Sequence, residues 1–274
     1  MTAYQCPLCA SSLDLDGDSK GFSCATGHHF DKAKEGYVHL LPVQHKHSKA
    51  PGDNKAMLQA RHAFLAAGYY QPLAAAMATM IQHHCHASSM QVLDLGCGEG
   101  YYSRQLALQL PQLQLHGLDI AKFAIAMAAK LQPSAQFAVA STLRLPYPEH
   151  SFDLVFRVFA PSNAEEIARV LKPGGWLLTV TPGPRHLWQL KEFIYPEARE
   201  HPATGGSDAY FSEISTQRCQ YTITPAREHR LALLQMTPFA WHASASAQQQ
   251  LAEAESLSIA TDFSLNLLQR TSLA

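Results

Sequence analysis

The chain has 274 residues, 47% of them hydrophobic, and its formal net charge is -1. This length allows one large domain with a small appendage and a sizeable buried core. The near-zero charge argues against unspecific binding of polyanions, so an RNA partner would have to be held by local basic patches. Apolar stretches such as LALLQM and GGWLLTV are far shorter than the roughly 18 to 20 residues that span a bilayer. Because the N-terminus also lacks a signal-peptide pattern, we expect a cytoplasmic protein that does not bind membranes.

The N-terminal segment is short and turn-rich, and it contains three of the six cysteines. Cys6 and Cys9 are separated by two residues, fourteen residues intervene before Cys24, and His28 follows after three more. This spacing suits a tetrahedral zinc site, although Cys6 and Cys9 alone would also fit a redox dithiol. His29 is a second candidate for the fourth ligand, but the spacing favours His28. Since four protein ligands leave no open coordination position, we expect one structural zinc ion.

Differences in composition divide the chain into a zinc-binding module of residues 1 to 37, a connector with helices over residues 38 to 82, and a larger domain over residues 83 to 274. Within the connector, PVQHKHSKAPGDNK is polar and is typical of a linker or a binding loop. The pattern AMLQARHAFLAAGYYQPLAAAMATMI then predicts a helix that breaks near Gly68 and restarts at Pro72, since proline suits the first turn of a helix.

Short apolar segments alternate with helical ones through the larger domain, which is typical of a doubly wound α/β sheet. Strands buried on both faces are expected at residues 92 to 96, 115 to 120, 137 to 141, 152 to 159 and 176 to 182. Helices are expected at residues 101 to 110, 121 to 131 and 163 to 172. Near the C-terminus, the pattern predicts a strand, a helix and a strand at residues 218 to 224, 227 to 241 and 262 to 270.

The strongest chemical signal is VLDLGCGEGYY, which spans residues 92 to 102. A strand is expected to end at Leu95, and Gly96, Gly98 and Gly100 then form a turn before a helix. The glycines allow a tight turn and a close approach of the backbone to a ligand, and the helix N-terminus offers free N–H groups. Nucleotide dehydrogenases use a similar turn, and a turn used only for packing is the remaining alternative.

Acidic residues around the turn favour one of these interpretations. Asp94 precedes the glycines within the strand, and Glu99 lies inside the turn, where its charge would repel a pyrophosphate. Asp119 ends the second strand about 20 residues later, where a carboxylate can accept both hydroxyl groups of a ribose. A ribose with a cationic, amino-acid-like tail describes S-adenosylmethionine, which is therefore the expected cofactor.

Together with LKPGGWLLT, this combination resembles the class I S-adenosylmethionine-dependent methyltransferases. The segments FDKAKEGYVHLLPVQHK, GYYQPL, VASTLRLP, TPGPRHL and LLQMTPFAW further resemble the bacterial 23S ribosomal RNA guanine-N1 methyltransferases, above all their housekeeping, Gram-negative branch. The resemblance covers nearly the whole chain. It implies a class I, Rossmann-like sheet with one antiparallel strand, preceded by a small zinc-binding module. The implied activity is methylation of N1 of one guanosine in a hairpin of 23S rRNA.

The resemblance also implies roles for particular residues. Zinc ligands fall on Cys6, Cys9, Cys24 and His28, in agreement with the spacing. Related enzymes form dimers whose paired subunits make a cleft for RNA, so a homodimer is expected. The glycine-turn region already predicts cofactor contacts at Asp94, Gly96 and Asp119. Position by position, the resemblance implies further cofactor contacts at Tyr70, Gly98, Glu99 and His186.

The sequence leaves the catalytic group open. Guanine N1 carries a proton that must leave before or during methyl transfer, so a base or a group that stabilises negative charge on O6 is needed. The candidate is Arg157, in the segment where related enzymes hold the target base. Its structural alternative is a salt bridge with Glu165 or Glu166. For the whole chain, the alternative function is methylation of a small molecule, with the zinc module as a structural cap.

Two polar segments are expected to assist the reaction. The zinc module and the stretch HKHSKAPGDNK would bind phosphates of the hairpin through Lys32, Lys34, Lys46 and Lys49, because lysines attract the RNA backbone. Residues 200 to 210, EHPATGGSDAY, are expected to close over the site.

Overall fold

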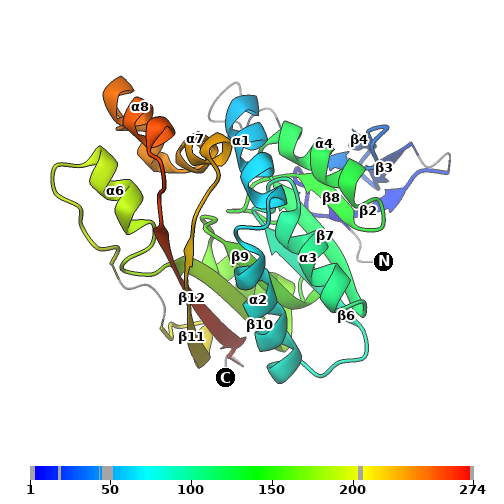
Figure 1. Cartoon of the computed structure of the whole chain (residues 1–274). Helices are drawn as coiled ribbons and strands as arrows, with labels where there is room; N and C mark the ends of the chain where they lie inside the picture. The colour runs from blue at the N-terminus through cyan, green and yellow to red at the C-terminus, as the bar shows by residue number, and fades with distance from the viewer. Residues whose placement is uncertain (1–3, 18–19, 43, 45–51, 203–205, 272–274) are drawn as a thin grey trace.

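The computed structural model describes residues 4–17, 20–42, 44, 52–202 and 206–271, and its centre is one large mixed sheet (Figure 1). In space, its strands follow one another as β11 (Phe211–Ile223), β12 (Ile259–Arg270), β10 (Leu171–Pro182), β9 (Phe152–Val158), β6 (Met90–Leu95), β7 (Leu113–Asp119), β8 (Gln136–Val139) and β5 (Val38–His39). β12 is antiparallel to both of its neighbours, and the other neighbouring pairs are parallel. This confirms the expected doubly wound sheet with one antiparallel strand.

Alternate residues of the central strands pack into different apolar clusters, because successive side chains of a strand point to opposite faces. Val92 of β6 packs with residues of α2 and α3, whereas Leu93 and Leu95 pack with α5 and with the N-terminal module. This arrangement buries the end of β6, where Asp94 lies. The helices that cover the sheet are α2 (Gln71–His84), α3 (Tyr101–Gln109), α4 (Lys122–Leu131) and α5 (Ala164–Val170).

The N-terminal module is a separate antiparallel sheet of β1 (Tyr4–Gln5), β2 (Ser12–Leu15), β3 (Gly21–Cys24) and β4 (His29–Asp31). It is attached firmly to the larger domain. The backbone N–H of Gln5 donates to the C=O of Pro146 at 2.9 Å, and the rings of Tyr4 and Tyr147 lie 5.4 Å apart. β5, the next strand, then joins the large sheet by pairing with β8. The module therefore shares its apolar core with the larger domain.

The two helices predicted for the connector are present, with the expected break near Gly68. α1 (Lys55–Ala66) starts after Asn54, whose side chain accepts a hydrogen bond from the N–H of Met57 at 3.0 Å. The chain turns at Gly68, which has a φ of +83°, and Pro72 lies in the first turn of α2. α1 packs beside α7 (Arg227–Gln235), at the top of the view in Figure 1.

The C-terminal region differs from its prediction in two helices. The helix expected to reach residue 241 ends at Gln235, and a separate 3-10 helix covers Pro238–Trp241. The reason is Pro238, which lacks the N–H needed to continue the hydrogen bonds of an α-helix. The stretch SASAQQQ, which shows no clear pattern, forms the start of α8 (Ala245–Glu253) because the side chain of Ser244 caps it.

Two further elements escape the sequence pattern. α6 (Trp188–Ile194) has only two turns, which is too short for a clear helical period. β11 begins at Phe211, whereas the sequence pattern predicts a start at residue 218. The pattern misses the first part of the strand because most of its side chains are exposed and polar, so apolar and polar residues do not alternate there.

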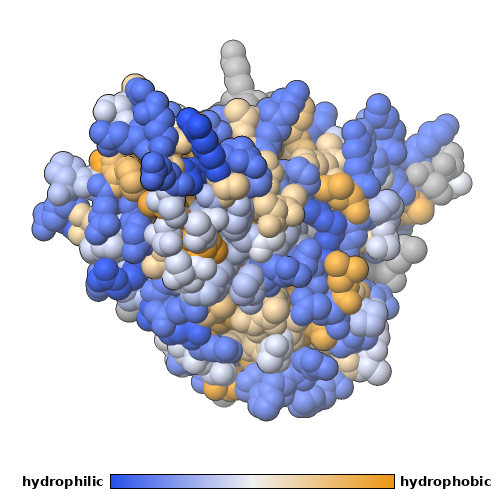
Figure 2. All heavy atoms as spheres, viewed as in Figure 1, coloured by the Kyte–Doolittle hydropathy of each residue, from blue (hydrophilic) through white to orange (hydrophobic). Residues whose placement is uncertain are grey.

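None of the described helices is long and apolar enough to cross a bilayer. The face in Figure 2 is mostly hydrophilic, with apolar side chains in smaller areas between polar ones. Several large apolar side chains nevertheless remain exposed, among them Phe159 at 46% and Trp241 at 75%. Both become important at the candidate site.

Candidate active site and metal centre

The glycine turn joins β6 to α3 through backbone conformations that favour glycine. Gly96, Gly98 and Gly100 have φ values of +75°, +56° and +75°. A Cβ on Gly96 would lie 2.5 Å from the Cβ of Ala160, so this glycine lets the loop after β9 approach the turn. A Cβ on Gly98 would meet nothing closer than Nη1 of Arg61, at 4.0 Å. The turn therefore leaves room for a ligand beside Gly98.

Two carboxylates face the same space. Asp94 is 2% exposed and accepts a hydrogen bond from Oγ of Ser103 at 2.7 Å. Burial, with a smaller contribution from the charge of Asp119, raises the pKa of Asp94 to about 7. Asp119 accepts hydrogen bonds from the N–H groups of Gly98 at 2.9 Å and Ala121 at 2.8 Å, and each of its oxygens can accept another. The pair suits a ligand that carries hydroxyl groups and positive charge.

The third carboxylate, Glu99, is 1% exposed. Its Oε2 accepts a hydrogen bond from Nη2 of Arg104 at 2.8 Å and lies 3.4 Å from Nδ1 of His62. Its Oε1 is buried and has no hydrogen-bond partner among the described residues. Leaving a buried acceptor without a donor costs about 1–3 kcal/mol, so a donor from a bound cofactor would fit here.

Tyr70 and His186 come from distant parts of the sequence, yet their ring centroids are 6.3 Å apart and Phe263 packs against both. The N–H of Asp262 donates to Nδ1 of His186 at 3.2 Å, which assigns the proton of the neutral ring to Nε2. Burial lowers the pKa of His186 to about 3. The ring is therefore neutral near pH 7 and offers an N–H donor rather than a charge.

A cavity of about 920 Å³ brings these groups together at the carboxyl ends of the central strands. Small-molecule sites typically occupy ~300–1,000 Å³. The chain places β9 next to β6 after building β7 and β8 on the other side, and ligands of open α/β sheets bind at such switch points. The cavity is lined by Arg157 and by all seven residues predicted to contact the cofactor, namely Tyr70, Asp94, Gly96, Gly98, Glu99, Asp119 and His186.

The candidate catalytic residue, Arg157, lies in the wall of this cavity near the end of β9. Its Nη1 donates to the C=O of Ala160 at 2.8 Å, and its buried Nε has no hydrogen-bond partner among the described residues. The alternative of a salt bridge with Glu165 or Glu166 is not found among the described residues, where Glu166 pairs with Arg169. Burial lowers the pKa of Arg157. This partly buried cation is thus placed to stabilise negative charge on a ligand.

The sequence gives several lining residues no role of their own, although Trp241 lies in the segment LLQMTPFAW and Phe159 lies two residues after Arg157. Arg61 of α1 lies over the glycine turn, pairs with Asp53 and donates to the C=O of Met236 at 3.3 Å. Phe159 and Trp241 line the cavity from the loop after β9 and from the 3-10 helix. Only the tertiary fold brings these segments together. A lone arginine on a helix and two aromatic residues in loops would otherwise pass as ordinary surface positions.

The segments expected to bind phosphates and to close over the site are described only in part. Lys46, Lys49 and residues 203–205 lie outside the described residues. His201, from the second of these segments, lines the cavity.

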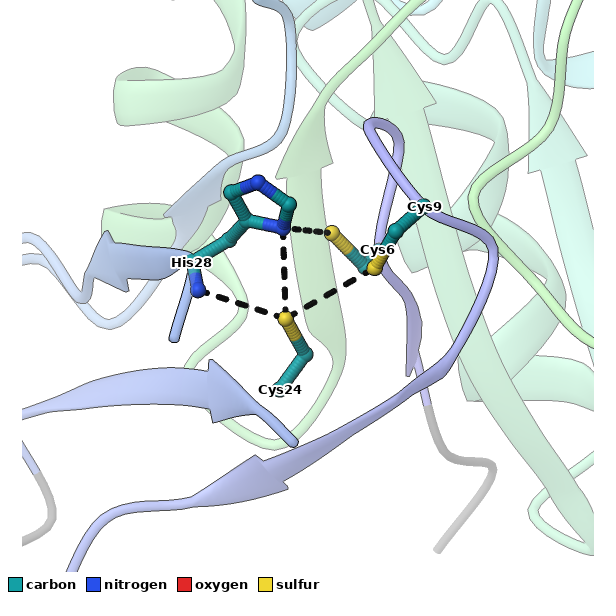
Figure 3. Close-up of side chains that lie close together, drawn as sticks. All are labelled: Cys6, Cys9, Cys24 and His28. Carbon is teal, nitrogen blue, oxygen red and sulfur yellow. Dashed lines mark hydrogen bonds between the residues drawn. The ribbon is translucent and has the colours of Figure 1, made fainter. Parts of the chain in front are cut away.

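The predicted zinc ligands form a compact cluster in the N-terminal module (Figure 3), with all four ligand atoms within 4.8 Å of one another. Sγ of Cys9 lies 3.7 Å from Sγ of Cys24, and Nδ1 of His28 lies 3.5 Å from Sγ of Cys6 and 3.4 Å from that of Cys24. A tetrahedral zinc ion, with bonds of about 2.3 Å to sulfur and 2.0–2.1 Å to nitrogen, places its ligands roughly 3.5–3.8 Å apart. The cluster therefore fits one zinc ion held entirely by protein ligands.

Two alternatives for this cluster explain it less well. A redox dithiol would need only Cys6 and Cys9, whereas the structure brings Cys24 and His28 into the same cluster with them. The other histidine, His29, lies 3.3 Å from a carboxylate oxygen of Asp16 and 3.1 Å from one of Asp31, outside the cluster. A structural zinc site therefore explains the four residues best.

Comparisons with known proteins agree with both parts of this geometry. Residues 4–49 match a zinc ribbon family described as RlmA, N-terminal, and residues 92–175 match a methyltransferase domain. The chain is 31% identical over 244 residues to the 23S rRNA (guanine(748)-N(1))-methyltransferase of Streptomyces fradiae, which covers 87% of this chain and 85% of that protein. It is 30% identical over 275 residues to YxjB of Bacillus subtilis (strain 168), with 94% of each protein covered.

Further similarities to other methyltransferases cover less of the chain. A malonyl-[acyl-carrier protein] O-methyltransferase of Halorhodospira halophila is 32% identical over only 37% of this chain. A solved structure from work on the conversion of a disulfide bond into a thioacetal group during echinomycin biosynthesis shares the fold, with a TM-score of 0.50 and 17% identity over 72% of this chain and 83% of that one. The near-full-length relatives decide the assignment: the chain belongs to the family of 23S rRNA (guanine-N1)-methyltransferases, with an N-terminal zinc ribbon and a class I methyltransferase domain.

Proposed function

We propose that the chain transfers a methyl group from S-adenosylmethionine to N1 of one guanosine in a hairpin of 23S rRNA. The observation that carries this proposal is the similarity to the Streptomyces fradiae enzyme over 87% of the chain, and the match of residues 4–49 to the RlmA zinc ribbon supports it. We further propose that the chain belongs to the housekeeping, Gram-negative branch of the family, which its sequence resembles.

Bound S-adenosylmethionine would supply a methyl group on a sulfonium, whose leaving group is already activated. Asp119 would accept hydrogen bonds from the ribose hydroxyls, and Asp94 and Glu99 would face the cationic end of the cofactor. The unpartnered Oε1 of Glu99 and the open space beside Gly98 support this placement. Tyr70 and His186, which line the same cavity, would complete the binding site as a hydroxyl group and a neutral N–H donor.

The chain must also help guanine to lose its N1 proton. Deprotonation places negative charge on N1 and O6 of the base, and a nearby cation stabilises such charge. We assign this role to Arg157, whose guanidinium has a buried Nε free of protein partners among the described residues. In this mechanism Arg157 lowers the pKa of the bound base rather than accepting its proton, and the proton passes to solvent water.

In this proposal, the zinc ribbon and the formation of a dimer both contribute to binding of the RNA. Residues 1 to 37 form the zinc-binding module, residues 38 to 82 the connector with its helices, and residues 83 to 274 the methyltransferase domain. Cys6, Cys9, Cys24 and His28 would hold one structural zinc ion that shapes a surface for the hairpin. We further propose a cytoplasmic homodimer whose paired subunits hold the RNA.

The proposed function is tested directly by substrate choice. The protein is incubated with labelled S-adenosylmethionine and unmethylated 23S rRNA, and the modified position is mapped by primer extension, which N1-methylguanine blocks. Label in the RNA with a stop at one guanosine is the expected result. Unlabelled RNA, with label transferred to small molecules from a cell extract, would overturn it in favour of a small-molecule methyltransferase.

A further inference from the structure

The cavity is chemically divided into two halves. Its carboxylates, Asp53, Asp94, Glu99 and Asp119, lie around the glycine turn and the start of α1. A second wall comes from residues 157–161, the turn after β10, His201 and the 3-10 helix, and it contains no carboxylate among its described residues. It presents Arg157 and the rings of Phe159, His201, Phe239 and Trp241. His186 adjoins both walls, because its ring centroid lies 6.3 Å from that of Tyr70 and 5.7 Å from that of Phe159.

Four of these rings follow one another along the wall. The ring centroids of Phe159 and His186 are 5.7 Å apart, those of His186 and His201 6.4 Å, and those of His201 and Phe239 6.4 Å. Burial lowers the pKa of both histidines, so the wall is not an anion site made of imidazolium groups. Neutral ring faces without acidic groups suit a flat base better than a sulfonium cofactor, which the carboxylate half would attract.

Phe159 stands out within this wall because of its backbone. Its φ of +56° lies in the left-handed region that disfavours side chains with a Cβ, and its N–H donates to the C=O of Val180 at 3.1 Å. The side chain is 46% exposed, so core packing does not explain why a phenylalanine is held there. Backbone strain of this kind gathers at functional sites.

The loop that carries Phe159 touches the glycine turn. A Cβ on Gly96 would lie 2.5 Å from the Cβ of Ala160, the residue after Phe159. Arg157, two residues before Phe159, lines the same cavity. A base stacked on Phe159 would therefore lie next to the glycine turn, where the cofactor is expected, and close to the guanidinium of Arg157.

From these observations we infer that Phe159 is the platform on which the target guanine stacks, and that Trp241 stacks a neighbouring nucleotide of the same loop. The inference rests on the proposed function. N1 lies on the Watson–Crick edge, so the base must be unpaired or flipped out, and an aromatic ring replaces the stacking that it loses. Trp241 has a cavity-lining ring that is 75% exposed, which suits a nucleotide outside the cavity.

The test is Phe159→Gly in the full-length protein. Glycine removes the ring and relieves the positive φ, so the melting temperature should stay the same or rise. The affinity for S-adenosylmethionine, measured by calorimetry, should change by less than about twofold because the cofactor half is intact. The single-turnover rate at saturating 23S rRNA should fall by about 10- to 100-fold, as expected for the loss of one base–aromatic stack. Phe159→Tyr, which keeps a ring, should restore the rate.

The matched control is His150→Gly. His150 also has a φ of +56° but does not line the cavity, so this variant should keep the wild-type rate. Trp241→Leu should instead weaken RNA binding by about 10-fold, with little change of the rate at saturation. A Phe159→Gly protein within about twofold of the wild-type rate would overturn the inference alone. A wild-type protein that leaves 23S rRNA unmethylated would remove the proposed function together with it.

Discussion

Nη1 of Arg61 lies 4.0 Å from the position that a Cβ on Gly98 would occupy, so the guanidinium stands over the glycine turn. Through its pair with Asp53 and its hydrogen bond to Met236, Arg61 also connects α1 to the end of α7. Burial raises the pKa of Asp119, the charge of Asp53 adds to this increase, and Arg61 opposes it. Arg61 thus offsets part of the negative charge of the carboxylates in the cavity and fixes α1 against the end of α7.

Replacing Arg61 should therefore weaken cofactor binding. In Arg61→Ala, Asp53 loses its partner and the link from α1 to α7 is broken, so the Kd for S-adenosylmethionine should rise about 10-fold, or roughly 1.4 kcal/mol. Calorimetry measures the change. Arg199→Ala is the control, because Arg199 pairs with Glu197 on the exposed surface. An unaltered Kd in Arg61→Ala would show that α1 does not cover the cofactor.

Affinity for S-adenosylmethionine should increase as the pH rises through about 7. Burial raises the pKa of Asp94 to about 7, so at lower pH the free protein carries a neutral acid at this position. A cationic ligand favours the carboxylate, and its binding must then release a proton. Calorimetry in buffers of different ionisation enthalpy measures this release directly. Asp94→Asn should flatten the pH dependence, and an equally steep profile in that variant would assign it to another group.

The same shift predicts a pH-dependent difference in stability. The folded-state pKa of Asp94 lies above its ordinary value of 3.8, so its favourable contribution is complete at low pH and is lost as the pH rises through about 7. Asp94→Asn stays neutral, and its stability relative to the wild type should therefore improve with rising pH. Urea unfolding at several pH values gives the difference between the two proteins. A difference that does not vary with pH would contradict the raised pKa.

The two glycines at the turn should respond differently to alanine. Both have positive φ, which costs a residue with a Cβ about 1–2 kcal/mol. In Gly96→Ala the new Cβ also collides with Ala160, so the melting temperature should fall further than in Gly98→Ala. Gly98→Ala fills the open space of the cofactor site and should mainly weaken S-adenosylmethionine binding. Equal losses of stability in the two variants would contradict the close contact at Ala160.

Zinc should be lost from Cys24→Ala together with the structure of the N-terminal module. Removing one of four ligands opens the site, and folding of small zinc modules depends on the metal. Metal analysis should find about one zinc per chain in the wild type and in His29→Ala, but much less in Cys24→Ala. Limited proteolysis should cut Cys24→Ala within the module. Full occupancy in Cys24→Ala would exclude Cys24 as a ligand.

Arg157→Ala should slow methyl transfer and shift its pH profile upward. Without the guanidinium, the bound guanine loses its N1 proton at higher pH, so the rate should recover partly in alkaline buffer. A single-turnover profile across the neutral to alkaline range measures this effect. Arg157→Lys keeps the charge and should lie between the two proteins. A rate and profile identical to wild type would remove Arg157 from the chemistry.

The parts of the site that can be read from the sequence are those whose signals are local. Asp94, the glycines and Asp119 follow one another at strand ends with a fixed spacing, and the zinc ligands form a similarly short pattern. Arg61 and Phe159 have no such signal, because a helical arginine and a loop phenylalanine occur everywhere. The role of Arg61 depends on the packing of α1 against α7 over the cavity. The role of Phe159 depends on the position of the loop after β9 and on a positive φ, which the identity of a phenylalanine does not predict.

The zinc ribbon shares more than a boundary with the methyltransferase domain. Tyr4 and Leu13 lie in the same apolar cluster as Tyr147 and Phe152, directly against the central sheet. A ribbon taken from another family member would have to match this surface or leave a hole under β9. An exchange of ribbons between family members therefore requires the contact residues of the ribbon and of the methyltransferase domain to change together, because the two parts share one apolar core.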